Sequence, residues 1–307
     1  MIFRATILLL ALSTQAAYAA EADTAAVHHA PALTIPDGDY TKGEVLGAIH
    51  ALETQYQADR GPGTQTSLIG TYVRGHELLV YPFYEYTTNK DQEYKPEELG
   101  YPGNGDFRGK STENEALLFL SYGVNDGLAF EIESAVWSDA TLEKSPTDPS
   151  TMPPELKESG FGDTQAEVRW RWWKETESRP EFFSYFETVF PFQKGKKILG
   201  TQDWEFVQGF GLIKWYRWGT MSARVSASYT TDPGTLDLGE VGLEWLKRFS
   251  PKFRAAVLVE GEQDEWALVP EAQWHWSPRA FLKVNNGFGL TSKAPDQAPE
   301  VGVVFSF

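Results

Sequence analysis

The last nine residues of the chain read Pro299-Glu300-Val301-Gly302-Val303-Val304-Phe305-Ser306-Phe307. Four apolar residues take every second position: Val301, Val303, Phe305 and Phe307. Because successive side chains of a β-strand point to opposite faces, this spacing predicts a terminal strand with one apolar face. The other face then carries Glu300, Gly302, Val304 and Ser306.

The same period of two recurs from Glu77 onward, in segments separated by turn-forming residues. Asn125-Asp126-Gly127, for example, is a strong signal for a tight β-hairpin. The pattern predicts twelve strands: Glu77 to Thr88, Lys110 to Gly123, Gly127 to Ser138, Asp163 to Lys174, Glu181 to Pro191, Asp203 to Arg217, Thr220 to Thr230, Leu236 to Lys247, Lys252 to Gly261, Glu265 to Trp276, Arg279 to Leu290 and Ala298 to Phe307.

The connections between these segments alternate in length. Every second one is mostly tight, as at Trp218-Gly219 and Ser277-Pro278, whereas those between are long or moderate, up to Asp139 to Gly162. Short turns at one end and longer loops at the other are typical of a transmembrane β-barrel. Aromatic residues also gather near both ends of the segments, where they would form belts at the two membrane interfaces.

Within a segment, charge separates cleanly from apolar surface. Between Asp163 and Lys174, Val168 and Trp170 alternate with Arg169 and Arg171. An unpaired charge facing hydrocarbon is costly, so the charged face must line the interior. The sequence therefore predicts an all-β fold, a transmembrane up-and-down antiparallel β-barrel of about 12 strands that spans residues 75–307.

The alternation predicts an inner wall rich in titratable side chains. Two interpretations stay open: a lattice of ion pairs that braces a closed interior, or the wall of a pore that selects cations or polar solutes, with the excess of acids favouring cations. The predicted pore-lining residues are Glu131, Glu133, Glu167, Arg169, Arg171, Glu187, Arg224, Glu244, Arg254, Glu260, Glu271, His275 and Lys283.

The N-terminal residues predict an export signal and an extension. Arg4, the apolar run from Ala5 to Leu12 and Ala17-Tyr18-Ala19 fit a signal peptide over residues 1–19. Residues 20–74 are expected to form a periplasmic extension with one short amphipathic helix, from Gly43 to Gln57. That extension either stays loosely ordered or packs its helix into or under the barrel.

Composition excludes several classes of function. The formal net charge of −16 argues against a nucleic-acid partner, and the absence of cysteine excludes a disulfide framework. We expect no cofactor and no metal site. His275 is the one histidine within a predicted strand, and no serine lies at a spacing from it that would indicate a nucleophile with its base. We therefore predict no catalytic residues and no enzyme.

Two motifs resemble known membrane barrels. The strand that closes on Phe307 resembles the terminal strand of bacterial outer-membrane β-barrels, which implies that Val301, Val303, Phe305 and Phe307 close the barrel and serve as its assembly signal. Gly160-Phe161-Gly162-Asp163 and the strand from His76 to Thr88 resemble a family of outer-membrane transporters associated with the MetA pathway of phenol degradation. This resemblance implies a role in passing small, hydrophobic or aromatic molecules.

Together these observations predict a channel or transporter for small solutes in the bacterial outer membrane. Its expected partners are outer-membrane lipid, the barrel assembly machinery and a small-molecule solute. The first alternative is a closed structural barrel whose long loops meet a partner outside the cell. The second is an outer-membrane lipid hydrolase.

Overall fold

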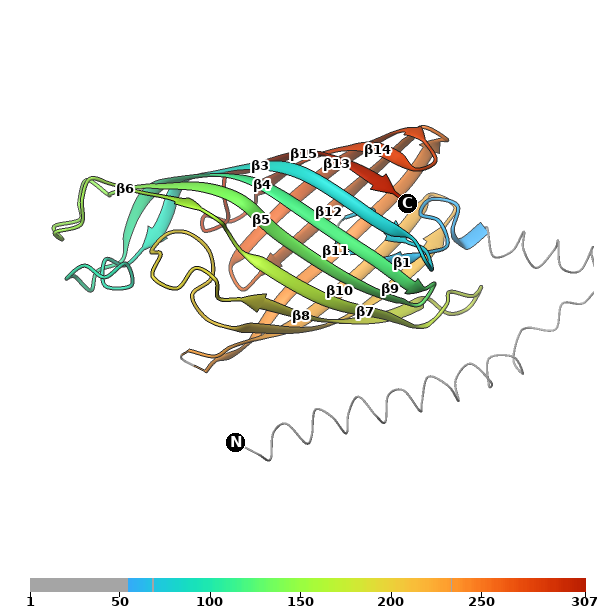
Figure 1. Cartoon of the computed structure of the whole chain (residues 1–307), viewed down its shortest axis with the longest axis horizontal. Helices are drawn as coiled ribbons and strands as arrows, with labels where there is room; N and C mark the ends of the chain where they lie inside the picture. Colours follow the sequence, from blue (N-terminus) through green and yellow to red (C-terminus); the bar gives the residue numbers. More distant parts are fainter. Residues whose placement is uncertain (1–54, 68, 233) are drawn as a thin grey trace, which may run out of the picture.

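The computed structural model describes residues 55–67, 69–232 and 234–307. In this part of the chain all long elements are β-strands, and thirteen of them form one sheet. Twelve close into an antiparallel ring because β3 pairs with β15 and β4 pairs with β5, while β6 pairs only with the distal part of β5. Figure 1 shows the resulting barrel, with strongly tilted strands.

The bounds of the elements follow the predicted segments closely, and the expected fold is confirmed. The strands are β1 (Thr64–Gln65), β2 (Tyr72–Val73), β3 (Leu78–Tyr94), β4 (Phe107–Asn125), β5 (Leu128–Glu143), β6 (Glu155–Gly160), β7 (Thr164–Trp173), β8 (Glu181–Phe190), β9 (Glu205–Tyr216), β10 (Gly219–Thr230), β11 (Leu236–Ser250), β12 (Phe253–Glu262), β13 (Glu265–Ser277), β14 (Ala280–Gly289) and β15 (Gln297–Ser306).

Three differences from the prediction lie at the ends of strands. β3, β4 and β5 extend beyond the barrel at the end with the long loops, where β6 joins β5 within a segment expected to be loop. Outside the membrane both faces of a strand can be polar, so the period of two fades there. The connection between β12 and β13 is also a tight turn, in which Gln263 takes a positive φ of 49°.

The outer wall is apolar, as a membrane barrel requires. On β10, Val225 and Tyr229 are 44% and 36% exposed, whereas the alternating residues Ser226 and Ser228 are 4% and 6% exposed. A lipid-facing surface is the physical reason for exposed apolar side chains on every second position. No helix among the described residues is long and apolar enough to cross a membrane.

The two ends of the barrel differ. The turns from β4 to β5, β9 to β10 and β13 to β14 lie at the same end as the C-terminus, and the long loops lie at the opposite end (Figure 1). In membrane barrels the short turns face the periplasm and the long loops face outward. The predicted signal peptide and nearly all of the predicted helix from Gly43 to Gln57 lie outside the described residues.

Candidate functional site: the plugged lumen

Residues 59–67 and 69–73, here called the plug, lie inside the barrel at its short-turn end (Figure 1). Within the plug, β1 pairs with β2 as a short hairpin, with Thr64 opposite Val73. Thr64, Thr66 and Val73 are at most 1% exposed. The plug, which is most of the described part of the N-terminal extension, therefore occupies the lumen.

Arginines of β7 hold the backbone of the plug. Arg169 donates to Thr66 O at 2.9 Å and to Glu167 Oε1 at 2.5 Å, and its guanidinium lies over the rings of Phe183 and Tyr185. Arg171, two residues along the same inner face, donates to Gly63 O at 3.1 Å. Their period of two brings both guanidinium groups to the plug.

Carboxylates and an amide from other strands bind the tip of the hairpin. Glu244 of β11 accepts hydrogen bonds from Gln65 Nε2 at 2.7 Å and from Gly70 N at 3.0 Å. Glu131 of β5 accepts one from Ser67 N at 2.8 Å, and Gln273 of β13 donates to Gly70 O at 3.1 Å. The plug is thus tied to strands on several sides of the ring.

The base of the plug carries its strongest ion pair. Arg60 binds Glu181 through two nitrogens at 3.2 and 3.0 Å, and its Nη2 lies 3.6 Å from Glu175. Burial by itself lowers the pKa of Arg60, but the facing carboxylate of Glu181 outweighs it and the pKa is raised above its usual range. A paired, doubly bonded guanidinium of this kind fixes position as well as charge.

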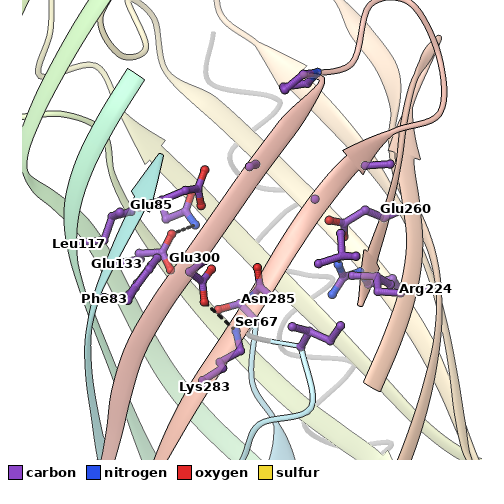
Figure 2. Close-up of a pocket in the computed structure, with 18 residues that line it drawn as sticks. Ser67, Phe83, Glu85, Leu117, Glu133, Arg224, Glu260, Lys283, Asn285 and Glu300 are labelled. Carbon is purple, nitrogen blue, oxygen red and sulfur yellow. Dashed lines mark hydrogen bonds and ion pairs between the residues drawn. The ribbon is translucent and has the colours of Figure 1, made fainter. Parts of the chain in front are cut away.

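A cavity of about 330 Å³ lies next to the plug, whose Ser67 and Ile69 form part of its wall (Figure 2). The apolar part of the wall comes from Phe83, Leu117, Leu258, Ala267 and Val269. Its charged residues are Glu85, Glu133, Glu260, Glu300, Arg224 and Lys283. The cavity therefore combines an apolar surface with an excess of acids.

The bases in this wall are already paired, but two of the acids are not. Lys283 Nζ lies 3.2 Å from both Glu271 and Glu300, and Figure 2 shows the pair with Glu300. Arg224 is shared between Glu240 and Glu260. Glu85 and Glu133 have no ion-pair partner among the described residues; Glu133 accepts a hydrogen bond from Gln165 at 3.3 Å. Two carboxyl groups without a basic partner thus face the cavity.

The structure distributes the residues predicted to line a pore over three groups. Glu131, Arg169, Arg171 and Glu244 contact the plug; Glu167 binds Arg169, and Glu271 accepts a hydrogen bond from Gln273, which also contacts the plug. Glu133, Arg224, Glu260 and Lys283 line the cavity. Glu187, Arg254 and His275 do neither: His275 stacks on Phe281 at 4.3 Å and bonds Gln273 at 3.2 Å.

Several residues of the site were not predicted. Glu85 was missed because β3 carries apolar residues on both faces, which hides the inner one. Gln65 was missed because β1 is two residues long, too short for any periodic signal, and Arg60 because it precedes β1 and lies in no strand. Glu300, by contrast, lies on the charged face of the terminal strand, and the alternation of residues 299–307 predicted that this face points inward.

The motif residues Gly160, Gly162 and Asp163 connect β6 to β7. Gly160 has a φ of +147°, and a Cβ on Gly162 would lie 2.7 Å from that of Ala135. Asp163 accepts hydrogen bonds from the backbone N–H of Thr201 at 2.5 Å and from its hydroxyl at 2.8 Å. The motif thus turns the chain and anchors the loop between β8 and β9.

The predicted closure residues lie on β15, and Phe307 directly follows that strand. Val301 pairs with Tyr84 and Phe305 with Val80 of β3, and Phe307 exchanges two backbone hydrogen bonds with Leu78. Among the described residues no group of three or more His, Asp or Glu side chains is arranged to hold a metal ion.

No protein-family model matches the sequence, and no curated protein matches it either. Solved structures do match. An outer membrane channel from Pseudomonas putida F1 is 14% identical, with a TM-score of 0.55 over 76% of this chain and 97% of that chain. The translocator domain of the autotransporter NalP from Neisseria meningitidis is 9% identical, with a TM-score of 0.45 over 86% of this chain and 98% of that one. The KdgM porin is 10% identical, with a TM-score of 0.43 over 74% and 99%.

At this level of identity the likeness to the P. putida channel concerns the fold. Together with the closed ring and the apolar outer wall, it agrees with the expected location. The protein is a twelve-stranded β-barrel of the bacterial outer membrane.

Proposed function

We propose that the barrel is a channel or transporter for small solutes whose lumen the plug closes in the state described here. The observation that carries the proposal is the cavity of about 330 Å³ beside the plug, bounded by side chains of most of the strands around the ring. An eight-stranded barrel is filled by its own side chains, but a larger ring leaves space that can hold a solute.

The contacts that hold the plug also support the proposal that it can leave the lumen. Beside the apolar contacts of Ile69 and Val73, the plug is held by hydrogen bonds and ion pairs to Arg169, Arg171, Glu131, Glu181 and Glu244. Each of these groups can bind water or a solute ion once the plug leaves, so the open lumen would stay hydrated. A purely apolar plug would leave behind a surface that does not conduct ions.

The lining suggests which solutes pass. Phe83, Leu117 and Leu258 offer apolar contact, and Glu85 and Glu133 offer carboxyl groups that have no basic partner among the described residues and can interact with a cation. We therefore propose small neutral or cationic molecules, including hydrophobic and aromatic ones, as the transported class. The resemblance to the phenol-associated transporters led to the same expectation.

A closed structural barrel is the competing function. It is favoured by the ion-pair lattice around Arg224 and Lys283, and by the ordered projection in which Tyr94, Leu99, Leu142 and Met152 form an apolar cluster beyond the membrane. Such a projection could meet a partner outside the cell. The two functions differ in whether any solute crosses.

Uptake into liposomes that contain the full chain separates them. We expect benzylammonium to enter faster than benzoate, which has a similar size and the opposite charge. The variant Glu85→Gln/Glu133→Gln should lower this ratio severalfold, whereas Glu143→Gln/Glu155→Gln, at exposed sites outside the lumen, should leave it unchanged. If neither solute enters at a rate above that of protein-free liposomes, the closed barrel is supported instead.

A further inference from the structure

Five aromatic rings contact one another in an unbroken series along β8, β9 and the two ends of the loop between them; three of the four contacts are stacked, and that of Phe190 with Trp204 is edge-to-face. The centroids of Phe186 and Phe206 are 6.3 Å apart, those of Phe206 and Trp204 6.1 Å, those of Trp204 and Phe190 5.4 Å, and those of Phe190 and Phe192 5.4 Å. Among the described residues this is the longest series of aromatic rings in contact. We call it the aromatic ladder.

The aromatic ladder faces lipid rather than the lumen. On β8, Phe186 and Phe190 alternate with Tyr185 and Val189, which are 5% and 7% exposed on the inner face. Phe192 and Trp204, at the top of the series, are 59% and 39% exposed. Since β8 ends and β9 begins at the long-loop side, the ladder rises through the outer leaflet to its headgroups (Figure 1).

A basic loop continues from the top of the ladder. Residues 191–204 contain Lys194, Lys196 and Lys197 against one acid, Asp203, in a chain whose net charge is −16. None of the three lysines has an ion-pair partner among the described residues. Lys196 Nζ donates to Ser159 O at 2.9 Å, Lys197 Nζ lies 3.9 Å from the ring centroid of Tyr101, and Lys194 is exposed.

Other lysines at this end of the barrel are paired with acids. Lys95 lies 3.1 Å from Glu98, Lys110 3.1 Å from Glu143, and Lys157 2.7 Å from Glu155. Lys90 and Lys144 at this end have no ion-pair partner in the described part of the chain either, but each stands alone, so the loop 191–204 is where three such lysines lie within four residues of sequence.

The loop is also held in place. Glu158 Oε2 accepts the backbone N–H groups of Lys197 and Ile198 at 2.8 and 3.0 Å, and Asp163 binds Thr201. Leu199 is 1% exposed. Fixed lysines lose less freedom on binding an anion than lysines on a free loop.

We propose that the aromatic ladder and the loop 191–204 bind a phosphorylated glycolipid of the outer leaflet, with its acyl chains along the rings and its phosphate groups at Lys194, Lys196 and Lys197. The charge complementarity is specific to this part of the rim, and the rings supply the adjoining apolar surface. Clusters of basic residues next to a membrane-embedded surface bind anionic lipid headgroups by electrostatic attraction. The site is separate from the lumen and does not depend on solute transport.

The test measures binding of purified bisphosphorylated lipid A to the full chain in detergent, by native mass spectrometry. The variant Lys194→Ala/Lys196→Ala/Lys197→Ala should bind at least about tenfold more weakly, given the usual contribution of a lysine near an anionic lipid surface. The matched control Lys95→Ala/Lys110→Ala/Lys157→Ala removes equal charge from the same rim and should change binding less than about twofold. Heat-modifiable mobility on gels verifies that both variants fold.

A second pair of variants tests the ladder. Phe192→Ala/Trp204→Ala should weaken binding severalfold, whereas Trp274→Ala/Trp276→Ala, on exposed residues at the opposite end, should not. The wild-type chain should also bind dephosphorylated lipid A less well than the phosphorylated form. The proposal is overturned if the loop variant binds lipid A as the wild type does, or if the control triple variant loses as much affinity.

Discussion

Arg169 binds a residue of the barrel wall and a residue of the plug. Its guanidinium binds Glu167 within β7 and Thr66 O within the plug, while the side chain is 1% exposed. A buried charge is tolerated only when its partners neutralise it and satisfy its hydrogen bonds. Each partner therefore depends on the others, and the loss of the arginine leaves Glu167 and Glu131 uncompensated.

Arg169→Met should loosen the plug without removing the apolar stem of the side chain. Breaking one side of a buried ion pair costs roughly 3–5 kcal/mol, and part of that cost falls on the plug. We expect amide hydrogen exchange over residues 64–73 of the full chain to rise at least about tenfold, since tenfold corresponds to about 1.4 kcal/mol.

Arg108→Met is the control for this substitution, because Arg108 lies outside the lumen and is 3.6 Å from Glu93 in an exposed pair. Exposed pairs contribute about 0–1 kcal/mol, so exchange in the plug should not change. Equal exchange in the two variants would show that Arg169 does not hold the plug.

The sequence predicted which faces these residues take, but not what they bind. Arg169, Arg224 and Lys283 were assigned to the interior because each alternates with apolar neighbours on its own strand. Their partners come from other strands or from the plug, as with Arg224 and Glu260 or Arg169 and Thr66. Such pairings depend on the register between strands, which alternation within one strand does not contain.

At the scale of elements, the plug is distinguished by its glycines. Gly70 has a φ of +62°, and a Cβ there would lie 2.8 Å from Gln273 Nε2 and 3.1 Å from Glu271 Oε1. The hairpin can therefore turn against the wall only with glycine at this position. Gly61 also has a positive φ, +105°, but a Cβ there would have no neighbour within 4 Å.

Gly70→Ala should displace the tip of the plug. The positive φ alone costs an L-residue about 1–2 kcal/mol, and the clash with Gln273 adds to it. The chain has no native cysteine, so Ser67→Cys gives a single reporter beside the cavity. We expect a membrane-impermeant thiol reagent to label Cys at this position several times faster when Gly70→Ala is also present.

Gly61→Ala, combined with the same reporter, provides the comparison. It imposes the backbone strain without the clash, so labelling should rise less than in Gly70→Ala. If both glycine variants label at the rate of the reporter alone, the tip of the plug is not held by its fit against β13.

The twelve barrel strands were predictable because lipid on one side and charge on the other produce a period of two over many residues. The plug was not, since β1 and β2 are two residues each and the hydrogen bonds of the hairpin are mainly to the wall. The upper parts of β3, β4 and β5 were also missed, because both of their faces meet water.

At the scale of the whole molecule, the outer wall fixes the location in the membrane. Val225 lies near the middle of β10, and Leu236 begins β11 at the long-loop end; they are 44% and 74% exposed. The cost of a charge on a lipid-facing position depends on its depth. The two residues therefore probe the same face at two depths.

Val225→Arg should destabilise the folded barrel by roughly 2–4 kcal/mol, and Leu236→Arg by about 0–1 kcal/mol. Urea unfolding in lipid vesicles, followed by heat-modifiable gel mobility, measures both. Equal effects would argue that the membrane does not cover this face as the fold implies. This comparison of two substitutions tests how the barrel lies in the membrane and does not depend on whether it transports a solute.

The central claim is that the plug alone closes a lumen that otherwise conducts, and single-channel recording in planar bilayers tests it most directly. The full chain should open briefly and rarely, which is enough for the slow uptake into liposomes proposed above, whereas a chain without residues 21–73 should show steady conductance that favours cations, in keeping with the unpaired Glu85 and Glu133. A truncated barrel that folds but stays silent at every voltage would contradict the claim, as would a full chain that conducts as well as the truncated one.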